Sequence, residues 1–284
     1  MLCAYCGEDR PATKEHVWSA SLIRLTEKEA PYTFDPHREK VYGAHPQLKD
    51  TCAPCNNLLL SPADAAMLEF AQRHLLGAIE PETVLNLGDP RLTRWVLKTA
   101  YNHDRSHPEL RTRRAGMWRP ILPSLLDRGP LVPGVEIWFG SWREPFGNGM
   151  LEGLNVVHRL DARELILYLE GLEPGEAERH LAATWGLKVA CGVFALLVWQ
   201  PSTAPELKER TAAGFRSADW LPMHDGQLAG QGPFNKYTAA TYHVICHPDH
   251  LPTPGGRPKP VDEAVGETLV RLQAEHKAAM RDAD

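Results

Sequence analysis

Four of the six cysteines stand in two pairs that have the spacing of metal ligands. Cys3 and Cys6 form the first pair, Cys52 and Cys55 form the second, and two residues separate the members of each. This spacing lets one tight turn present both sulfurs to a tetrahedral ion, and Gly7 supplies the permissive backbone that such a turn often needs. The pattern therefore predicts a structural zinc ion with four thiolate ligands. Free thiols, or a single redox-active iron ion on the same ligands, are the alternatives.

A Glu-His dipeptide lies between the two cysteine pairs. Glu15 and His16 follow the first pair, Gln47 precedes the second, and Asn56 comes directly after the last of the four cysteines. This order resembles that of the zinc-bearing HNH endonucleases, which have the ββα-metal fold. The step of nine residues from Gln47 to Asn56 is the usual one in that family. The resemblance covers about the first 75 residues of the chain.

The resemblance implies a catalytic site built from these residues. Glu15 and Asn56, with Asn57 as the alternative to Asn56, would supply oxygen ligands to a catalytic Mg²⁺ or similar divalent ion. His16 would be the general base that deprotonates the attacking water, and Gln47 would orient it in place of the usual asparagine. The ion would stabilise charge on the phosphate and on the departing 3′ oxygen. Adjacent residues of a strand point to opposite faces, so Glu15 and His16 can serve one site only if the strand ends or bends there.

The segment between His16 and Gln47 departs from the family pattern. It is longer than is common, and Gln47 is one methylene longer than the asparagine it replaces. The segment contains His37 and His45. Either histidine could replace a missing ligand, and the alternative is a solvated surface residue.

A basic region follows the part of the chain that resembles a nuclease. Residues 91–143 carry ten arginines or lysines against four acids, whereas residues 1–60 carry seven against eight. Helical spacing places several of these bases on one face: Arg91, Arg94, Lys98 and Arg105. Tyr101 falls on the same stripe and could stack on a base. Residues 91–103 also resemble a helix that follows the core in one branch of bacterial HNH proteins. The face is either a nucleic-acid-binding surface or a solvated helix followed by a basic loop.

Periodicity and capping signals predict the elements that must position these residues. The segment 56–77 has a helical pattern in which Ser61 and Pro62 make a good cap and first turn, and a second helix is expected over 90–103. Alternating or continuous apolar runs predict strands at 135–142, 153–160, 164–171, 186–199 and 242–247. A Pro/Gly-rich connector and an amphipathic helix over about 261–281 end the chain.

Together these signals predict an α+β chain. An N-terminal ββα-metal (HNH) nuclease core, stapled by a zinc ion on four cysteines, is followed by helices and a β-rich C-terminal domain. The expected parts are a nuclease domain at 1–77, a helical and basic connecting region at 78–128, a mixed α+β domain of unknown role at 129–251, and a linker with a terminal helix at 252–284.

Composition and charge are those of a globular protein. Hydrophobic residues make up 43% and charged residues 24% of the 284 residues, and the net charge is −5. Bulk charge therefore gives no reason to expect nucleic-acid binding, and any such surface must be local. The first cysteine leaves no room for a signal peptide, and the longest apolar run, at 189–199, is about half of a membrane span. A cytoplasmic protein is expected, and in that compartment paired thiols more often bind metal.

The function that follows from the resemblance is a metal-dependent HNH endonuclease. It would hydrolyse phosphodiester bonds in DNA to leave a 5′ phosphate and a 3′ hydroxyl, and defence against foreign DNA is the setting that the resemblance implies. One alternative is a catalytically decayed, zinc-stapled module that binds nucleic acid or protein. Another is an iron-coordinated redox protein, which visible absorbance would distinguish because zinc thiolates are colourless.

Overall fold

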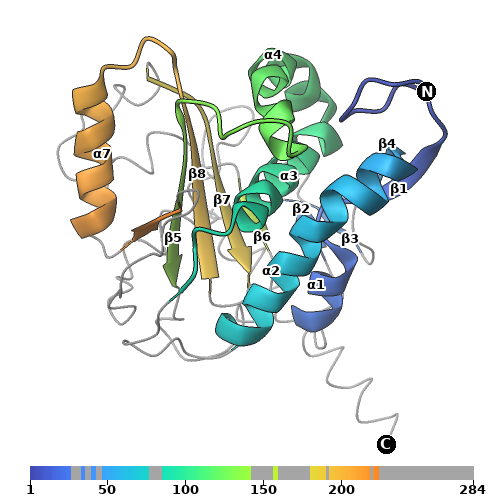
Figure 1. Ribbon diagram of the computed structural model, residues 1–284, viewed down its shortest axis with the longest axis horizontal. Helices are drawn as coiled ribbons and strands as arrows, with labels where there is room; N and C mark the ends of the chain where they lie inside the picture. Colours follow the sequence, from blue (N-terminus) through green and yellow to red (C-terminus); the bar gives the residue numbers. More distant parts are fainter. Residues whose placement is uncertain are drawn as a thin grey trace, which may run out of the picture.

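The computed structural model describes residues 1–26, 33–35, 40–42, 47–76, 85–141, 156–158, 180–189, 192–217 and 220–223 (Figure 1). These residues mix helices and strands, as the expected α+β class requires. Within these ranges every helix is too short or too polar to cross a membrane. Several sequence expectations lie outside the described residues: His37, His45, the strands at 164–171 and 242–247, the connector and the terminal helix.

Two antiparallel strands form the amino-terminal unit. β1 (Ala12–His16) lies against β4 (Gln47–Cys52), so that the first residue of each strand is opposite the last residue of the other. The register shifts between Thr13 and Glu15, and a bulge of this kind bends a strand and changes the direction of the next side chains. The bend therefore falls directly before the Glu-His dipeptide.

Three short elements occupy the insert between β1 and β4. They are α1 (Ala20–Thr26), β2 (Thr33–Asp35) and β3 (Lys40–Tyr42), and β2 pairs with β3 in antiparallel fashion. Leu22 of α1 is fully buried. The insert therefore contributes to the core.

The helix that follows β4 begins earlier than the capping signal predicted. Its first six residues are wound as a wider π-helix, η1 (Cys55–Leu60), and α2 (Ser61–His74) continues it. The prediction that Ser61 caps the helix is wrong, because Ser61 has helical backbone angles (φ −56°, ψ −38°) inside a continuous helix. The Asn56 side chain, in the first turn of this helix, bonds to β1. The change of winding falls beside Pro62, which lacks the N–H of a regular turn.

Helix α3 (Pro90–Ser106) runs through the centre of the molecule. Asp89 caps it by accepting a hydrogen bond from the Arg91 N–H at 2.9 Å. α3 contacts α2, the sheet and α4 (Pro108–Leu125) (Figure 1). Its side chains from Trp95 to Arg105 are buried. A basic loop was one interpretation of the segment after α3, but the structure forms α4 there, with two prolines inside the helix.

Five antiparallel strands form the sheet in the order β6–β7–β8–β5–β9. Their bounds are β5 (Val135–Ser141), β6 (Val156–His158), β7 (Leu181–Val189), β8 (Gly192–Trp199) and β9 (Leu221–Pro222). The prediction of one strand over 186–199 is wrong, because β7 ends at Val189, opposite the first residue of β8. Every described residue of β8 is buried, so the run lacks the alternation that would have revealed a hairpin.

The two faces of the sheet carry different helices. α3 contacts β6, β7 and β8 on one face. On the other face lies α7 (Pro205–Ser217) (Figure 1). The ring of Phe215 in α7 stacks on Trp138 of β5 with centroids 4.9 Å apart and planes 5° from parallel. The sheet is therefore an inner layer between helices.

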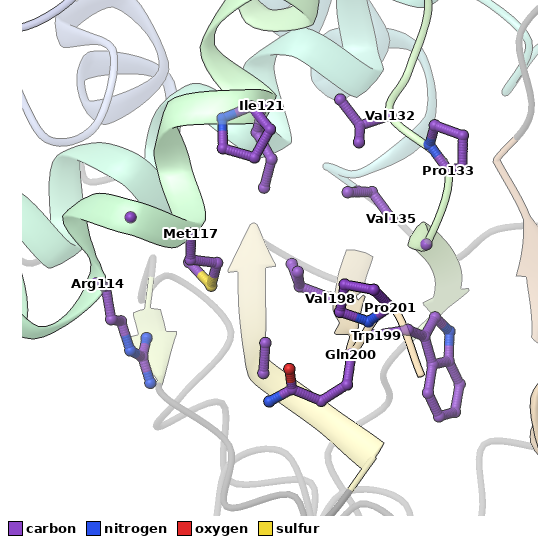
Figure 2. Close-up of a pocket in the computed structure, with 14 residues that line it drawn as sticks. Arg114, Met117, Ile121, Val132, Pro133, Val135, Val198, Trp199, Gln200 and Pro201 are labelled. Carbon is purple, nitrogen blue, oxygen red and sulfur yellow. The ribbon is translucent and has the colours of Figure 1, made fainter. Parts of the chain in front are cut away.

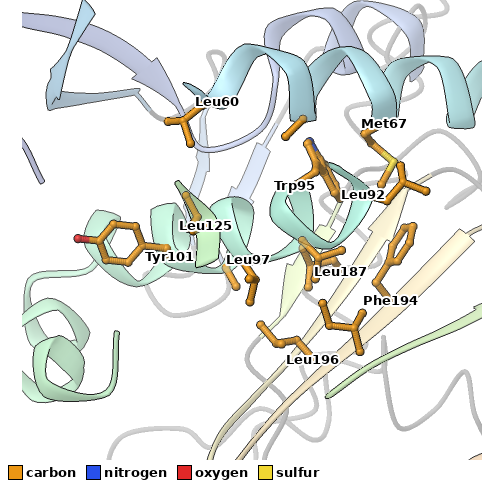
Figure 3. Packing of buried hydrophobic residues seen from close by; sticks show 14 of the residues in the cluster. Leu60, Met67, Leu92, Trp95, Leu97, Tyr101, Leu125, Leu187, Phe194 and Leu196 are labelled. Atoms are coloured by element: carbon orange, nitrogen blue, oxygen red, sulfur yellow. The ribbon is translucent and has the colours of Figure 1, made fainter. Parts of the chain in front are cut away.

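One hydrophobic cluster joins the amino-terminal unit to the sheet. Figure 3 shows Met67 of α2 beside Trp95 of α3, with Phe194 of β8 beyond, and the Trp95 and Phe194 rings are 6.1 Å apart. Cys3 and Cys52 belong to the same cluster. The cysteine-rich unit thus folds onto the core of the molecule, so a change at the cysteines will be felt in the packing of α3.

Candidate metal centre

The four paired cysteines meet at one point. The ligand atoms of Cys3, Cys6, Cys52 and Cys55 all lie within 4.8 Å of one another, and the sulfurs of Cys6 and Cys52 are 3.8 Å apart. Four sulfurs about 2.3 Å from a tetrahedral zinc ion would be separated by about 3.8 Å. The arrangement therefore fits zinc, and all four ligands are thiols, which closes the coordination sphere. Such a site supports the fold and has no position for a reacting water.

Backbone geometry shapes the first cysteine pair. Gly7 has φ 73°, a left-handed conformation that favours glycine, and its N–H donates to the Cys3 carbonyl at 2.9 Å. The Cys52 N–H donates to the Cys3 sulfur at 3.3 Å. Burial acts to raise the pKa of Cys3, but backbone N–H groups, that of Cys52 foremost, outweigh it and lower the pKa to about 7. This thiolate is therefore available near neutral pH.

Cys55 differs from Cys3 in its acid–base behaviour. Burial and the neighbouring thiols raise the pKa of Cys55 above its ordinary value. A bound metal ion must therefore displace protons from part of the site, so metal affinity will fall as the pH falls.

His16 and Gln47 form the contact that the sequence predicted. They face each other across β1 and β4, and the Gln47 Nε2 lies 3.1 Å from the His16 Nε2. In the tautomer with the proton on Nδ1, the amide donates to the imidazole and fixes the orientation of the ring. The His16 Nδ1 is buried, whereas the contact of Nε2 with Gln47 is exposed. Accepting a proton there requires the Gln47 amide to turn aside.

Glu15 points to the buried side of β1. It is 3% exposed, and the Lys98 ammonium lies 2.7 Å from its Oε1. The same ammonium contacts both oxygens of Asp64, at 2.7 and 2.8 Å. Burial raises the pKa of Glu15 although Lys98 opposes this, whereas the two carboxylates raise the pKa of Lys98 despite its burial. Burial is the largest cause for Glu15, and the two carboxylates outweigh burial for Lys98.

Asn102 of α3 connects Glu15 to the metal centre. Its amide nitrogen donates to the Glu15 Oε1 at 3.3 Å and to the His16 carbonyl at 3.0 Å. Its oxygen accepts from the hydroxyl of Tyr5, which stands between the first two cysteines, and from Arg105 at 2.8 Å. One fully buried amide therefore joins the cysteine turn to the Glu-His dipeptide.

The Asn56 side chain also forms hydrogen bonds with β1. Its amide nitrogen lies 3.0 Å from the Thr13 hydroxyl and 3.0 Å from the Lys14 carbonyl oxygen. A carbonyl oxygen only accepts, so the amide must present its NH₂ group to the strand. In this arrangement Glu15 does not fit a shared divalent ion with Asn56, because the Lys98 ammonium already holds its carboxylate. The contacts of Asn56 with β1 use its NH₂ group and not the amide oxygen that would bind an ion.

The basic residues that helical spacing placed on one face of α3 do not form a solvent-exposed surface. Lys98 is 1% exposed and Arg105 is 6% exposed. The Arg105 guanidinium lies 4.7 Å from the ring centroids of both Tyr5 and Tyr101, and 3.4 Å from Asp50. The other two bases of the stripe pair with acids, Arg91 with Asp89 and Arg94 with Asp127. A nucleic-acid surface on this helix could use only these last two arginines.

Sequence reasoning missed the residues that hold Glu15. Asp64, Lys98 and Asn102 come from two helices and form its environment. One signal was present, since apolar residues or small residues flank Lys98 on both sides in the run from Trp95 to Ala100. Such flanks indicate a helix buried all round. They do not identify the carboxylates.

A separate cavity lies between α4 and the sheet. It has a volume of about 470 Å³, and Figure 2 shows Met117, Ile121, Val135 and Val198 around it. Arg114 is the charged side chain among the described residues that line it, and its guanidinium is bound to a buried carboxylate. The cavity is thus mainly apolar and offers no catalytic group of its own.

Comparison with protein-family models, with curated proteins and with solved structures gives no match. The function is therefore inferred from the geometry of the described residues.

Proposed function

We propose that the chain is an HNH-type endonuclease that hydrolyses phosphodiester bonds in DNA. The observation that supports this most is the contact between His16 and Gln47 at the open end of a strand pair, which four converging thiols join to the following helix. Two antiparallel strands and a helix in this order agree with the ββα arrangement that the sequence resembles. The zinc site has a structural role in the proposal.

In the proposed reaction His16 is the general base. It takes a proton from water at Nε2, the water oxygen attacks phosphorus, and the bond between phosphorus and the 3′ oxygen breaks. The leaving oxygen takes a proton from solvent, which gives a 5′ phosphate and a 3′ hydroxyl. Gln47 fixes the orientation of the imidazole before substrate binds. Because Glu15 and Asn56 do not fit a shared ion as arranged, no step here depends on a divalent ion, and the assay tests its requirement separately.

Replacing His16 with alanine should lower the rate of plasmid nicking by about 100-fold or more, since positioned general bases typically contribute 10²–10⁴. The assay measures conversion of supercoiled to open-circular DNA with Mg²⁺, with Mn²⁺ and without added divalent ion. His74→Ala is the matched control, because His74 is also a half-buried histidine but lies on α2 away from the strand pair. Equal nicking by His16→Ala and the parent would contradict the proposal.

The second candidate function is a nucleic-acid-binding module without catalysis. The Lys98 contact favours it, because this contact holds the carboxylate to which the resemblance assigns a catalytic metal ion. Fluorescence anisotropy with labelled single- and double-stranded DNA and RNA measures binding. Binding by the parent without cleavage in any metal arm would favour this candidate over the nuclease.

A further inference from the structure

The Lys98 ammonium sits in a cage of carboxylate oxygens. Glu15 contributes one oxygen at 2.7 Å, and Asp64 contributes two at 2.7 and 2.8 Å. The three residues come from β1, α2 and α3, and the Lys98 side chain is 2% exposed. Lysine is almost never buried this completely unless it is paired. The ammonium is thus a cation bound inside the fold.

This cage has the donor chemistry of a site for a hard divalent cation. Calcium takes carboxylate oxygens, one or two from each residue, at about 2.3–2.6 Å, whereas magnesium requires about 2.0–2.1 Å and near-ideal octahedral geometry. The oxygens around Lys98 lie at 2.7–2.8 Å, so a contraction of a few tenths of an ångström would suit calcium. The amide nitrogen of Asn102 covers another side of the Glu15 carboxylate.

We propose that Lys98 takes the place of a divalent ion at Glu15. Glu15 and Asp64 form a cation site that the chain fills with its own ammonium, and a neutral side chain at position 98 turns it into a site for a calcium-sized ion. The wild-type chain therefore holds no divalent ion at Glu15. This inference rests on the contacts of Lys98 and not on the proposed nuclease activity, and it limits that activity to a mechanism without metal at Glu15.

Replacing Lys98 with methionine tests the inference, because methionine is an unbranched, uncharged side chain of similar length. Zinc-loaded protein is titrated with Ca²⁺ by isothermal calorimetry, and melting is followed with and without Ca²⁺. Lys98→Met should bind one Ca²⁺ per chain at least tenfold more tightly than the parent, and its melting temperature should rise with Ca²⁺ while that of the parent does not. Adding Glu15→Gln or Asp64→Asn to Lys98→Met should weaken this binding at least tenfold.

Lys208→Met is the matched control, since Lys208 is a half-buried lysine on α7 and should leave Ca²⁺ binding unchanged. If Lys98→Met folds only when Ca²⁺ is present, this too supports the inference. A folded Lys98→Met without Ca²⁺ binding, a parent that binds Ca²⁺ equally well, or a Lys98→Met that stays unfolded at saturating Ca²⁺ would overturn it. None of these measurements involves DNA cleavage, so they stand whether or not the nuclease proposal fails.

Discussion

Replacing Cys52 with serine should leave the protein without zinc and unfold its amino-terminal unit. Cys52 is 2% exposed and ends β4, three residues before the ligand that starts the next helix. A structural zinc ion contributes an apparent free energy of about 10–16 kcal/mol in small zinc domains, comparable to the roughly 5–15 kcal/mol that stabilise a whole protein. The melting temperature should therefore fall by at least about 10 °C. Elemental analysis and circular dichroism measure the two effects.

A control and two outcomes make this test decisive. Cys246→Ser changes a cysteine outside the four-thiol set and should retain one zinc ion per chain. Removing metal from the parent with a strong chelator should reproduce the effect of Cys52→Ser. A metal-free parent that melts unchanged would show that no structural ion is present, and a coloured protein with iron in place of zinc would favour the redox alternative.

The metal site could be predicted from the sequence because its information is local. Each cysteine pair is one turn, and four thiols are a ligand set that zinc and iron both accept. The partner of His16 was expected through the resemblance alone, because the segment between His16 and Gln47 is longer than is common in the family that the sequence resembles. The structure places Gln47 opposite His16 although 31 residues separate them.

The burial of Lys98 and Arg105 could not be predicted in the same way. Helical spacing placed them on one stripe, but spacing does not say whether the stripe faces water. That depends on partners far away in the chain, such as Asp64, which is 34 residues from Lys98. A charged residue becomes a core residue only when tertiary folding supplies its counter-charge.

The β7–β8 hairpin could not be predicted from the sequence, for a different physical reason. Both strands are buried on both faces, so polar residues do not alternate with apolar ones, and a continuous apolar run does not mark where the chain turns. The helix start was predicted wrongly because the backbone is already helical from Cys55, where Asn56 bonds to β1 and Cys55 joins the cysteine cluster. In each case the deciding interaction is non-local.

Replacing Asp104 with alanine should destabilise the protein by about 3–5 kcal/mol, the usual cost of breaking a buried ion pair. Asp104 is 1% exposed and accepts hydrogen bonds from Arg114 at 3.2 Å, from Trp118 at 2.9 Å and from Trp185 at 3.1 Å. It therefore ties α3 to α4 and to β7. Alanine would leave the Arg114 guanidinium, itself 6% exposed, without its carboxylate. Urea unfolding at pH 7 measures the loss.

The stability that Asp104 contributes should depend on pH in a definite direction. Burial acts to raise the pKa of Asp104, but His103, Arg114 and Trp118 outweigh it and hold the pKa below the ordinary 3.8. A lowered pKa means that the stability from ionised Asp104 is complete above about pH 4 and is lost as the pH falls through the folded-state value. The parent should therefore lose more stability than Asp104→Asn on acidification below about pH 4.

Glu209→Ala is the matched control, because Glu209 is 73% exposed and its pair with Arg216 is on the surface. Surface pairs of this kind contribute about 0–1 kcal/mol, so this variant should unfold almost as the parent does. If Asp104→Ala unfolds as easily as Glu209→Ala, Asp104 does not join the helices to the sheet. Helix α3 would then be held to β7 mainly by apolar packing. A large loss confined to Asp104→Ala would instead mean that this one carboxylate stabilises the packing of α3 against α4 and β7.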